Sequence, residues 1–150
     1  MAQLFYEDHK IGTRLMSRAR TIFDHDIGAF VGVSGMFEQL FVNREYYENQ
    51  SIYGKHIAPG LLVLSIAEGL CIQEGWLHET GLAFLGLDEF RISKPVATGD
   101  TVHVELEVVE ARETKRADRG IVKTRHEVKN QHGETVMSFY ATRMIKRRDA

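Results

Sequence analysis

The second half of the chain alternates apolar and polar residues in the pattern of half-buried antiparallel strands. In TVHVELEVVEA, residues 101–111, valine and leucine alternate with histidine and glutamate. Further strands are predicted over residues 82–92, 120–130 and 134–146. The last two are joined by Gln-His-Gly, a tight-turn sequence whose glycine tolerates positive φ. This half of the chain therefore predicts an antiparallel sheet.

The first half predicts one long helix with shorter elements before it. Residues 59–74, PGLLVLSIAEGLCIQE, are apolar nearly all round a helix, which indicates burial on most sides. Pro59 suits the first helical turn, where its missing N–H costs nothing. A buried helix followed by long antiparallel strands predicts an α+β fold in which the sheet wraps the helix. We expect one domain over residues 1–150.

The shorter elements are a strand and two helices. Residues 12–22 alternate loosely and predict the strand. Asp24 is the expected N-cap of a first short helix, which Ser34-Gly35 ends. Residues 43–50 predict a second short helix with Asn43 as its cap.

Composition narrows the classes of function. A formal charge of -2, from 19 basic and 21 acidic residues, gives no global attraction to nucleic acid or an anionic membrane surface. The single cysteine, Cys71, can form no internal disulfide and is expected to be a small buried apolar residue, which suits a reducing cytoplasm. The longest apolar run, residues 57–70, is too short and interrupted to span a bilayer. We expect a soluble, untargeted, cytoplasmic protein.

Four segments resemble a known family. They are TIFDHDIGAFVGVSG (21–35), YGKHIAPG (53–60), FRISKPVATGDTVHVELEV (90–108) and the hairpin around residues 130–134. Together they resemble the MaoC-like dehydratases, also called (R)-specific enoyl-CoA hydratases. The third segment is the most specific, because Arg91, Pro95, Gly99 and Asp100 fall together at the family's offsets.

The resemblance implies a hot dog fold, a long antiparallel sheet around a central helix. It also implies a thioester substrate on coenzyme A or acyl carrier protein, as in fatty acid metabolism, with water added to or removed from the 2,3 bond. No cofactor is expected, and the histidines show no paired metal-ligand spacing, so we expect no metal. The open sheet edge and the resemblance both predict a homodimer, or a higher oligomer of dimers, with sites at the subunit interface.

The family's proton carriers are missing. The family pattern Ser-Gly-Asp-x-Asn-Pro-x-His corresponds to SGMFEQLF, residues 34–41. Met36 therefore stands in place of the Asp and Phe41 in place of the His, while Pro59 replaces a histidine before the central helix. Neither methionine nor phenylalanine can transfer a proton. We expect Phe41 instead to shape the substrate pocket.

Three residues are candidates for displaced chemistry. Glu38 lies among apolar residues, and a carboxylate in such surroundings has the raised pKa that an acid or base near neutrality needs; alternatively it points to water. His56, just before the central helix, is a candidate base, or an ordinary loop histidine. Asn43 could orient water or the thioester, although an N-cap role also explains it.

The binding half of the site is expected at the start of the central helix. Pro59, Gly60 and their neighbours offer free backbone N–H groups and a partial positive charge to a thioester oxygen. Arg91 could contact coenzyme A phosphates or remain solvated. Glu68 is the main charged residue of the apolar helix, one turn after Ser65, and is the alternative catalytic residue of a hot dog thioesterase; it could instead bond Ser65 or a partner subunit.

Three hypotheses therefore remain open. The first is an acyl-thioester hydratase or dehydratase with a relocated acid or base, Glu38 first, assisted by His56 or Asn43. The second is a thioesterase that uses Glu68. The third is a non-catalytic acyl-thioester binder or a structural subunit. Fold alone does not decide among them.

Overall fold

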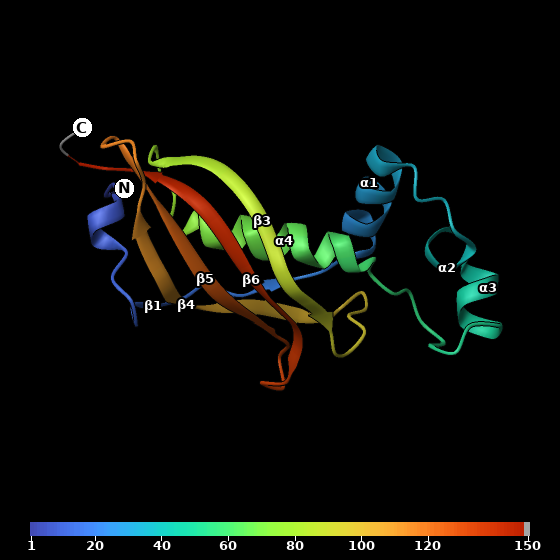
Figure 1. Ribbon diagram of the computed structural model, residues 1–150. Helices are drawn as coiled ribbons and strands as arrows, with labels where there is room; N and C mark the ends of the chain where they lie inside the picture. The colour runs from blue at the N-terminus through green and yellow to red at the C-terminus, as the bar shows by residue number, and fades with distance from the viewer. Residues whose placement is uncertain (149–150) are drawn as a thin grey trace.

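The computed structural model describes residues 1–148. A sheet curves around one long helix, and three short helices form an arm beyond the end of that helix (Figure 1). The elements are, in chain order, η1 (Tyr6–Asp8), β1 (Arg14–Met16), β2 (Arg20–Thr21), α1 (Asp24–Ser34), α2 (Gln39–Val42), α3 (Arg44–Asn49), α4 (Gly60–Gln73), β3 (Gly81–Ile92), β4 (Thr101–Glu113), β5 (Arg119–Lys129) and β6 (Thr135–Lys146).

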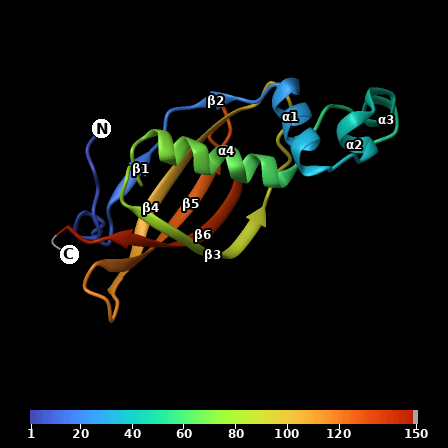
Figure 2. The ribbon, with the colours of Figure 1, turned by 90° about the horizontal axis from the view of Figure 1, so that it is seen from above.

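All strand pairs are antiparallel, in the order β1-β4-β5-β6-β3, with the short β2 also paired to β4. Seen from above, α4 lies across the concave face of this sheet (Figure 2). The predicted α+β hot dog fold is therefore confirmed. Strand β3 is an edge strand, and its ladder with β6 is interrupted by register shifts.

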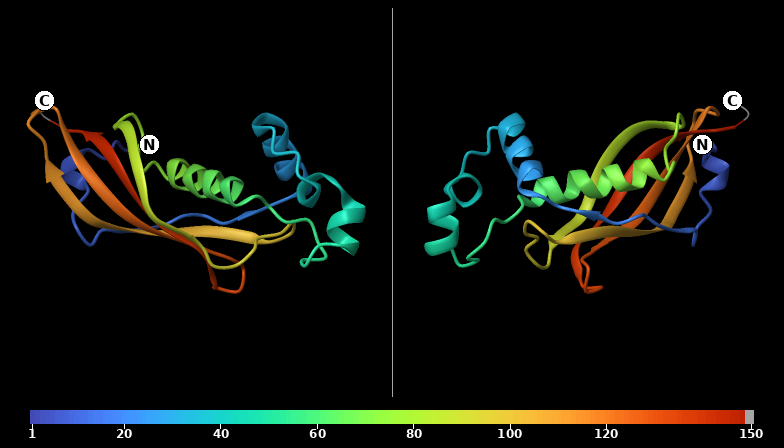
Figure 3. Two further views of the ribbon diagram at one scale, coloured as in Figure 1. Left: turned by 45° about the vertical axis from the view of Figure 1, so that its right-hand side comes forward. Right: turned by 180° about the vertical axis from the view of Figure 1, so that it is seen from behind.

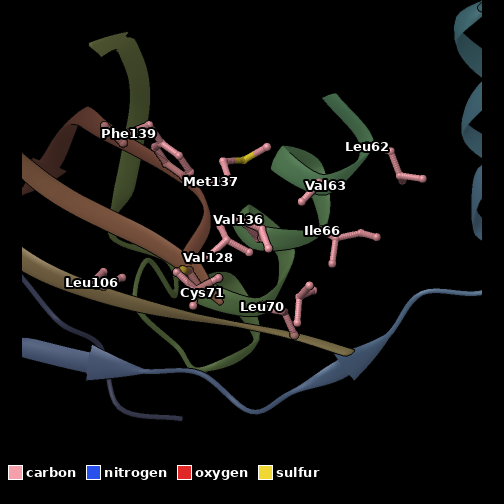
Figure 4. Close-up of a cluster of buried hydrophobic side chains, with 14 of the residues drawn as sticks. Leu62, Val63, Ile66, Leu70, Cys71, Leu106, Val128, Val136, Met137 and Phe139 are labelled. Atoms are coloured by element: carbon pink, nitrogen blue, oxygen red, sulfur yellow. The ribbon is translucent and has the colours of Figure 1, made fainter. Parts of the chain in front are cut away.

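The core fills the space between α4 and the sheet. Alternate residues of β4, from Val102 to Val108, are buried, as the period of a half-buried strand requires. They share a core with a helix that has six buried residues. Figure 4 shows Val63 and Cys71 of this helix near Val128 of β5 and Val136 of β6. Each large apolar side chain buried in this way contributes about 1.5 to 3 kcal/mol. Cys71 is buried among them, as predicted.

The helical arm, residues 24–56, projects past the start of α4 in every view (Figure 3). The core reaches into it chiefly through α1, whose Ile27 and Val31 are buried, and the partly buried Phe41 of α2 also packs against the core. The prediction of Asp24 as N-cap was wrong by one residue: Phe23 is the cap, and the Asp26 carboxylate accepts the Phe23 N–H at 2.9 Å. The predicted stop is confirmed, because Gly35 adopts a left-handed conformation with φ of 76°.

Two other expectations changed. The predicted strand over residues 12–22 is divided into β1 and β2, because between them the Ser17 hydroxyl, and not a strand partner, accepts the Val104 N–H at 2.9 Å. The four-residue helix α2 was not predicted.

The helix predicted over 59–74 is confirmed within one residue at each end, with Pro59 as N-cap of α4. Among the described residues, none of the helices is long and apolar enough to cross a membrane.

Candidate functional site

A cavity of about 310 Å³ lies where α4 begins. Its walls come from the helical arm, the segment leading into α4, the segment after β3, and β6. The lining is mostly apolar and consists of Leu40, Phe41, Tyr53, Ile57, Ala58, Pro59, Gly60, Val63, Ile92, Ser93, Lys94, Pro95, Val96, Val136 and Met137. Its one charged residue, Lys94, is ion-paired with Glu134.

The first turn of α4 presents unpaired backbone donors at this cavity. Pro59 provides no side-chain cap, and the first helical N–H groups with a backbone acceptor are those of Leu62 and Val63, both bonded to the Pro59 carbonyl. Within residues 1–148, the N–H groups of Gly60 and Leu61 have no acceptor. Two free donors and the positive end of the helix dipole therefore meet at Gly60.

The segment leading into α4 is held by the loop that carries the family-like Gly-Asp sequence. The Ala58 N–H donates to the Val96 carbonyl at 2.8 Å. The loop itself is closed by Asp100, whose carboxylate accepts the Ala97 N–H at 2.8 Å, after Gly99 turns with φ of 90°. These residues fix one cavity wall relative to the helix start.

His56 is bound on both sides of its ring. Nδ1 lies 2.6 Å from the Asp24 carboxylate, Nε2 lies 2.7 Å from the Phe41 carbonyl oxygen, and the ring stacks on Tyr47 at 4.6 Å. Its side chain is only 11% exposed. Each ring nitrogen therefore faces an oxygen atom of another segment. This geometry gives His56 an anchoring position between α1 and α2.

Glu38 does not have the apolar surroundings expected from its neighbours in sequence. It is exposed and is the N-cap of α2, where its carboxylate accepts the Gln39 N–H at 3.0 Å. Asn43 caps α3 by accepting the Tyr46 N–H at 3.3 Å, which confirms the N-cap interpretation. In the described part of the chain neither residue lines the cavity.

The residues predicted to bind substrate are divided. Phe41, Pro59 and Gly60 meet at the cavity, as expected. Arg91 does not: it lines a separate hollow of about 210 Å³ formed with Arg125, Ser138 and other residues.

Glu68 faces another part of the molecule. It forms an ion pair with Arg143, which is 3% exposed, and both line a separate hollow beside β3. Ser65 instead donates to the Leu61 carbonyl at 2.8 Å. Because Arg143 bonds this carboxylate and a buried guanidinium needs that partner, Glu68 is already committed to a structural interaction.

Sequence reasoning missed several cavity residues. Ile92 lies inside the family-like segment, two positions after its Phe90, but nothing in the local pattern indicates that its side chain faces the helix start. Val136 and Met137 come from β6 and reach the cavity only through the strand order. Such contacts depend on tertiary structure and have no sequence spacing that could reveal them.

Comparisons with known proteins agree over most of the chain. The family model described as MaoC like domain matches residues 8–130. Mesaconyl-CoA hydratase of Cereibacter sphaeroides is 38% identical over 152 residues, which cover 97% of this chain and 42% of that protein. The chain spans 30% to 42% of the curated relatives that it matches.

Solved structures are similar over nearly the full chain. The monoamine oxidase regulatory protein from Archaeoglobus superposes with a TM-score of 0.89 at 33% identity, covering 97% of this chain and 96% of that one. A MaoC-like dehydratase from Rhodospirillum rubrum gives a TM-score of 0.85 at 29% identity, covering 98% and 99%.

Proposed function

The chain belongs to the MaoC-like domain family, and on that premise we propose that it binds an acyl thioester in the cavity at the start of α4 and adds or removes water across the 2,3 bond. The thioester carrier is coenzyme A or acyl carrier protein. The observation that carries the proposal is a mostly apolar cavity lined by Gly60, where α4 begins with the unpaired N–H groups of Gly60 and of the adjacent Leu61. The name of the hydratase relative supports a coenzyme A thioester as substrate.

The helix start supplies the electrostatic part of the reaction. The thioester oxygen accepts hydrogen bonds from the N–H groups of Gly60 and Leu61, and negative charge grows on this oxygen when water adds to C3. Preorganised donors and the helix dipole stabilise that charge more than they stabilise the uncharged substrate. In hydration the water oxygen bonds to C3, one water proton goes to a base, and C2 receives a proton as the double bond is lost.

For proton transfer we retain Glu38 as the candidate. Among residues 1–148 its carboxylate bonds only the neighbouring Gln39 amide, and it belongs to the same arm segment as Leu40 and Phe41, which line the cavity. Adoption of this role requires the start of α2 to turn toward the cavity when substrate binds. His56 holds the Phe41 carbonyl and thereby positions that segment.

The experiment follows two products at once. Pure protein is incubated with straight and branched enoyl-CoA thioesters while enoyl absorbance and free thiol are recorded. We expect absorbance to fall without thiol release, and Glu38→Gln to abolish the loss. Glu45→Gln, another exposed glutamate of the arm, is the matched control and should retain activity.

The alternatives give different records. Thiol release abolished by Glu68→Gln would support the thioesterase. Acyl-CoA binding with no change in enoyl absorbance and no release of thiol would support a non-catalytic binder. This is the second candidate, because Met36 and Phe41 stand where the family has its proton carriers.

A homodimer, or a higher oligomer of dimers, is part of the proposal. Edge strand β3 exposes Leu82, Phe84 and Leu85, and α4 exposes Ile72 near the same hollow. A second copy paired along this edge would cover apolar surface that costs free energy in water. Light scattering should show a dimer, and Phe84→Glu should yield a monomer; a wild-type monomer would contradict this part.

A further inference from the structure

Ile92 touches the first residue of α4. It is the last residue of β3 and pairs with Met137 of β6, and its side chain lines the cavity. A Cβ added to Gly60 would overlap the Ile92 Cδ1 atom and would lie 3.7 Å from Cγ1. The δ-methyl group therefore occupies the space that a side chain at Gly60 would need.

This contact bears on the part of a substrate next to its carbonyl. A thioester oxygen bonded to the Gly60 N–H lies about 2.9 Å from that nitrogen. Carbon C2 of the acyl group is two bonds from this oxygen, so C2 and any substituent on it compete for the space beside Gly60. The cavity is also small, at about 310 Å³, near the lower end of the range of ligand pockets.

We propose, on the basis of the function proposed above, that Ile92 is a specificity-determining residue: its δ-methyl group against Gly60 limits the size of the substituent on C2 of the acyl thioester.

Ile92 is suited to this role because it can change without disturbing the core. Val63, Val136 and Met137, which share the cavity wall, are each at most 2% exposed and belong to the central core. Ile92 is 53% exposed. Evolution or design can therefore trim this one side chain at little cost in stability, because partly solvated positions tolerate substitution.

The first test compares two acyl groups that differ by one methylene. Wild type and Ile92→Val are tested for binding of 2-methylbutyryl-CoA and 2-ethylbutyryl-CoA by calorimetry, and for turnover of 2-methyl and 2-ethyl enoyl-CoA thioesters. Ile92→Val should raise the preference for the ethyl compound roughly tenfold in both measurements, the usual effect of one methylene in an apolar pocket. Ile11→Val, at a position 68% exposed before β1 that does not line the cavity, is the matched control and should leave the ratio unchanged.

The second test needs no turnover. Gly60→Ala should lower acyl-CoA affinity, because its Cβ needs the space that the Ile92 δ-methyl group occupies. Adding Ile92→Val removes that atom, leaves the ordinary 3.7 Å contact, and should restore the affinity.

The outcomes separate the two proposals. Binding of acyl-CoA with an unchanged methyl-to-ethyl ratio in Ile92→Val overturns the role of Ile92 alone. Failure of the double variant to recover acyl-CoA affinity overturns the contact on which the role depends. Absence of binding of any acyl-CoA by wild type overturns the proposed function and this role with it.

Discussion

In strands β4 to β6 most apolar side chains are buried, and α4 buries six residues, whereas in the arm of residues 24–56 many apolar side chains face solvent. Phe139 of β6 is fully enclosed. In the arm, Val33, Phe37 and Ile52 are largely exposed. The arm contains a similar choice of residues but lacks a surface of its own to bury them against.

The two regions therefore gain order from different sources. The sheet and α4 are ordered by a continuous core. The free energy that this core contributes is roughly proportional to the apolar area removed from water. The arm depends on a few contacts, chiefly Ile27 and Val31 of α1 and the bonds of His56. A segment with few buried contacts opens at lower free energy than the core does. The arm is thus the part of the cavity wall that can move when substrate binds.

The largest difference should appear when one chemical change is made in each region. Phe139→Ala should lower the free energy of unfolding by about 3 to 5 kcal/mol, because it leaves a cavity in a close-packed core. Phe37→Ala, at a side chain 68% exposed, should change it by less than about 0.5 kcal/mol. Urea denaturation measures both values; equal costs would show that the arm is packed against something in solution.

Acid should unfold the sheet region through His126. This histidine is buried, bonds Thr124 at 2.8 Å and stacks on Phe139, and burial, with the charge of Arg143, lowers its pKa from 6.5 to about 3. Between these pH values the histidine is protonated in the unfolded chain and neutral in the folded chain. The free energy of unfolding therefore falls as pH falls, by up to about 1.4 kcal/mol per pH unit. Burial also lowers the pKa of His9, which adds to the slope.

The measurement is the free energy of unfolding from pH 7 to 4. His126→Phe keeps the aromatic stack and should reduce the slope by about one proton, and His126→Asn provides a second variant without imidazole. The exposed His78→Asn is the control. A slope unchanged in both His126 variants would contradict the assignment.

A smaller loss is expected from the ion pair between α4 and β6. Glu68→Gln leaves the buried Arg143 guanidinium without its carboxylate partner and should cost roughly 1 to 3 kcal/mol. Glu74→Gln, at the C-cap of the same helix, removes a partner of the exposed Arg18 and should cost less than about 1 kcal/mol. Similar losses in both variants would mean that solvent reaches Arg143 freely.

The smallest global effect belongs to the arm anchor. The hydrogen bond from His56 lowers the pKa of the exposed Asp24 carboxyl, so this stabilisation is present above the ordinary aspartate pKa and is lost as pH falls through the lowered value. Asp24→Asn should change global stability by less than about 1 kcal/mol. Hydrogen exchange should nevertheless quicken at α2 and α3 and not in β4 to β6; uniform exchange changes would remove the distinction between the regions.

Sequence periodicity predicted strands β4 to β6 and helix α4 well because these elements bury side chains against one another over most of their length. The alternation in β4 and the apolar character of residues 59–74 both follow from which side chains are buried. The site was harder. Glu38 has apolar neighbours in sequence but faces water, and His56 has partners 32 and 15 residues away. Pro59 and Gly60 were predictable because a helix start is local, whereas Ile92 meets Gly60 only through the fold.

The placement of the chain ends has a practical use. Arg147 and Arg148, just after β6, form ion pairs with Glu7 and Asp8 of η1, so η1 lies beside the end of β6, at the end of the sheet far from the arm (Figures 1 and 3). A dye, an affinity tag or a linker to a sensor chip attached before η1 would therefore stand clear of the cavity mouth. Immobilised protein should keep the ligand access that it has in free solution.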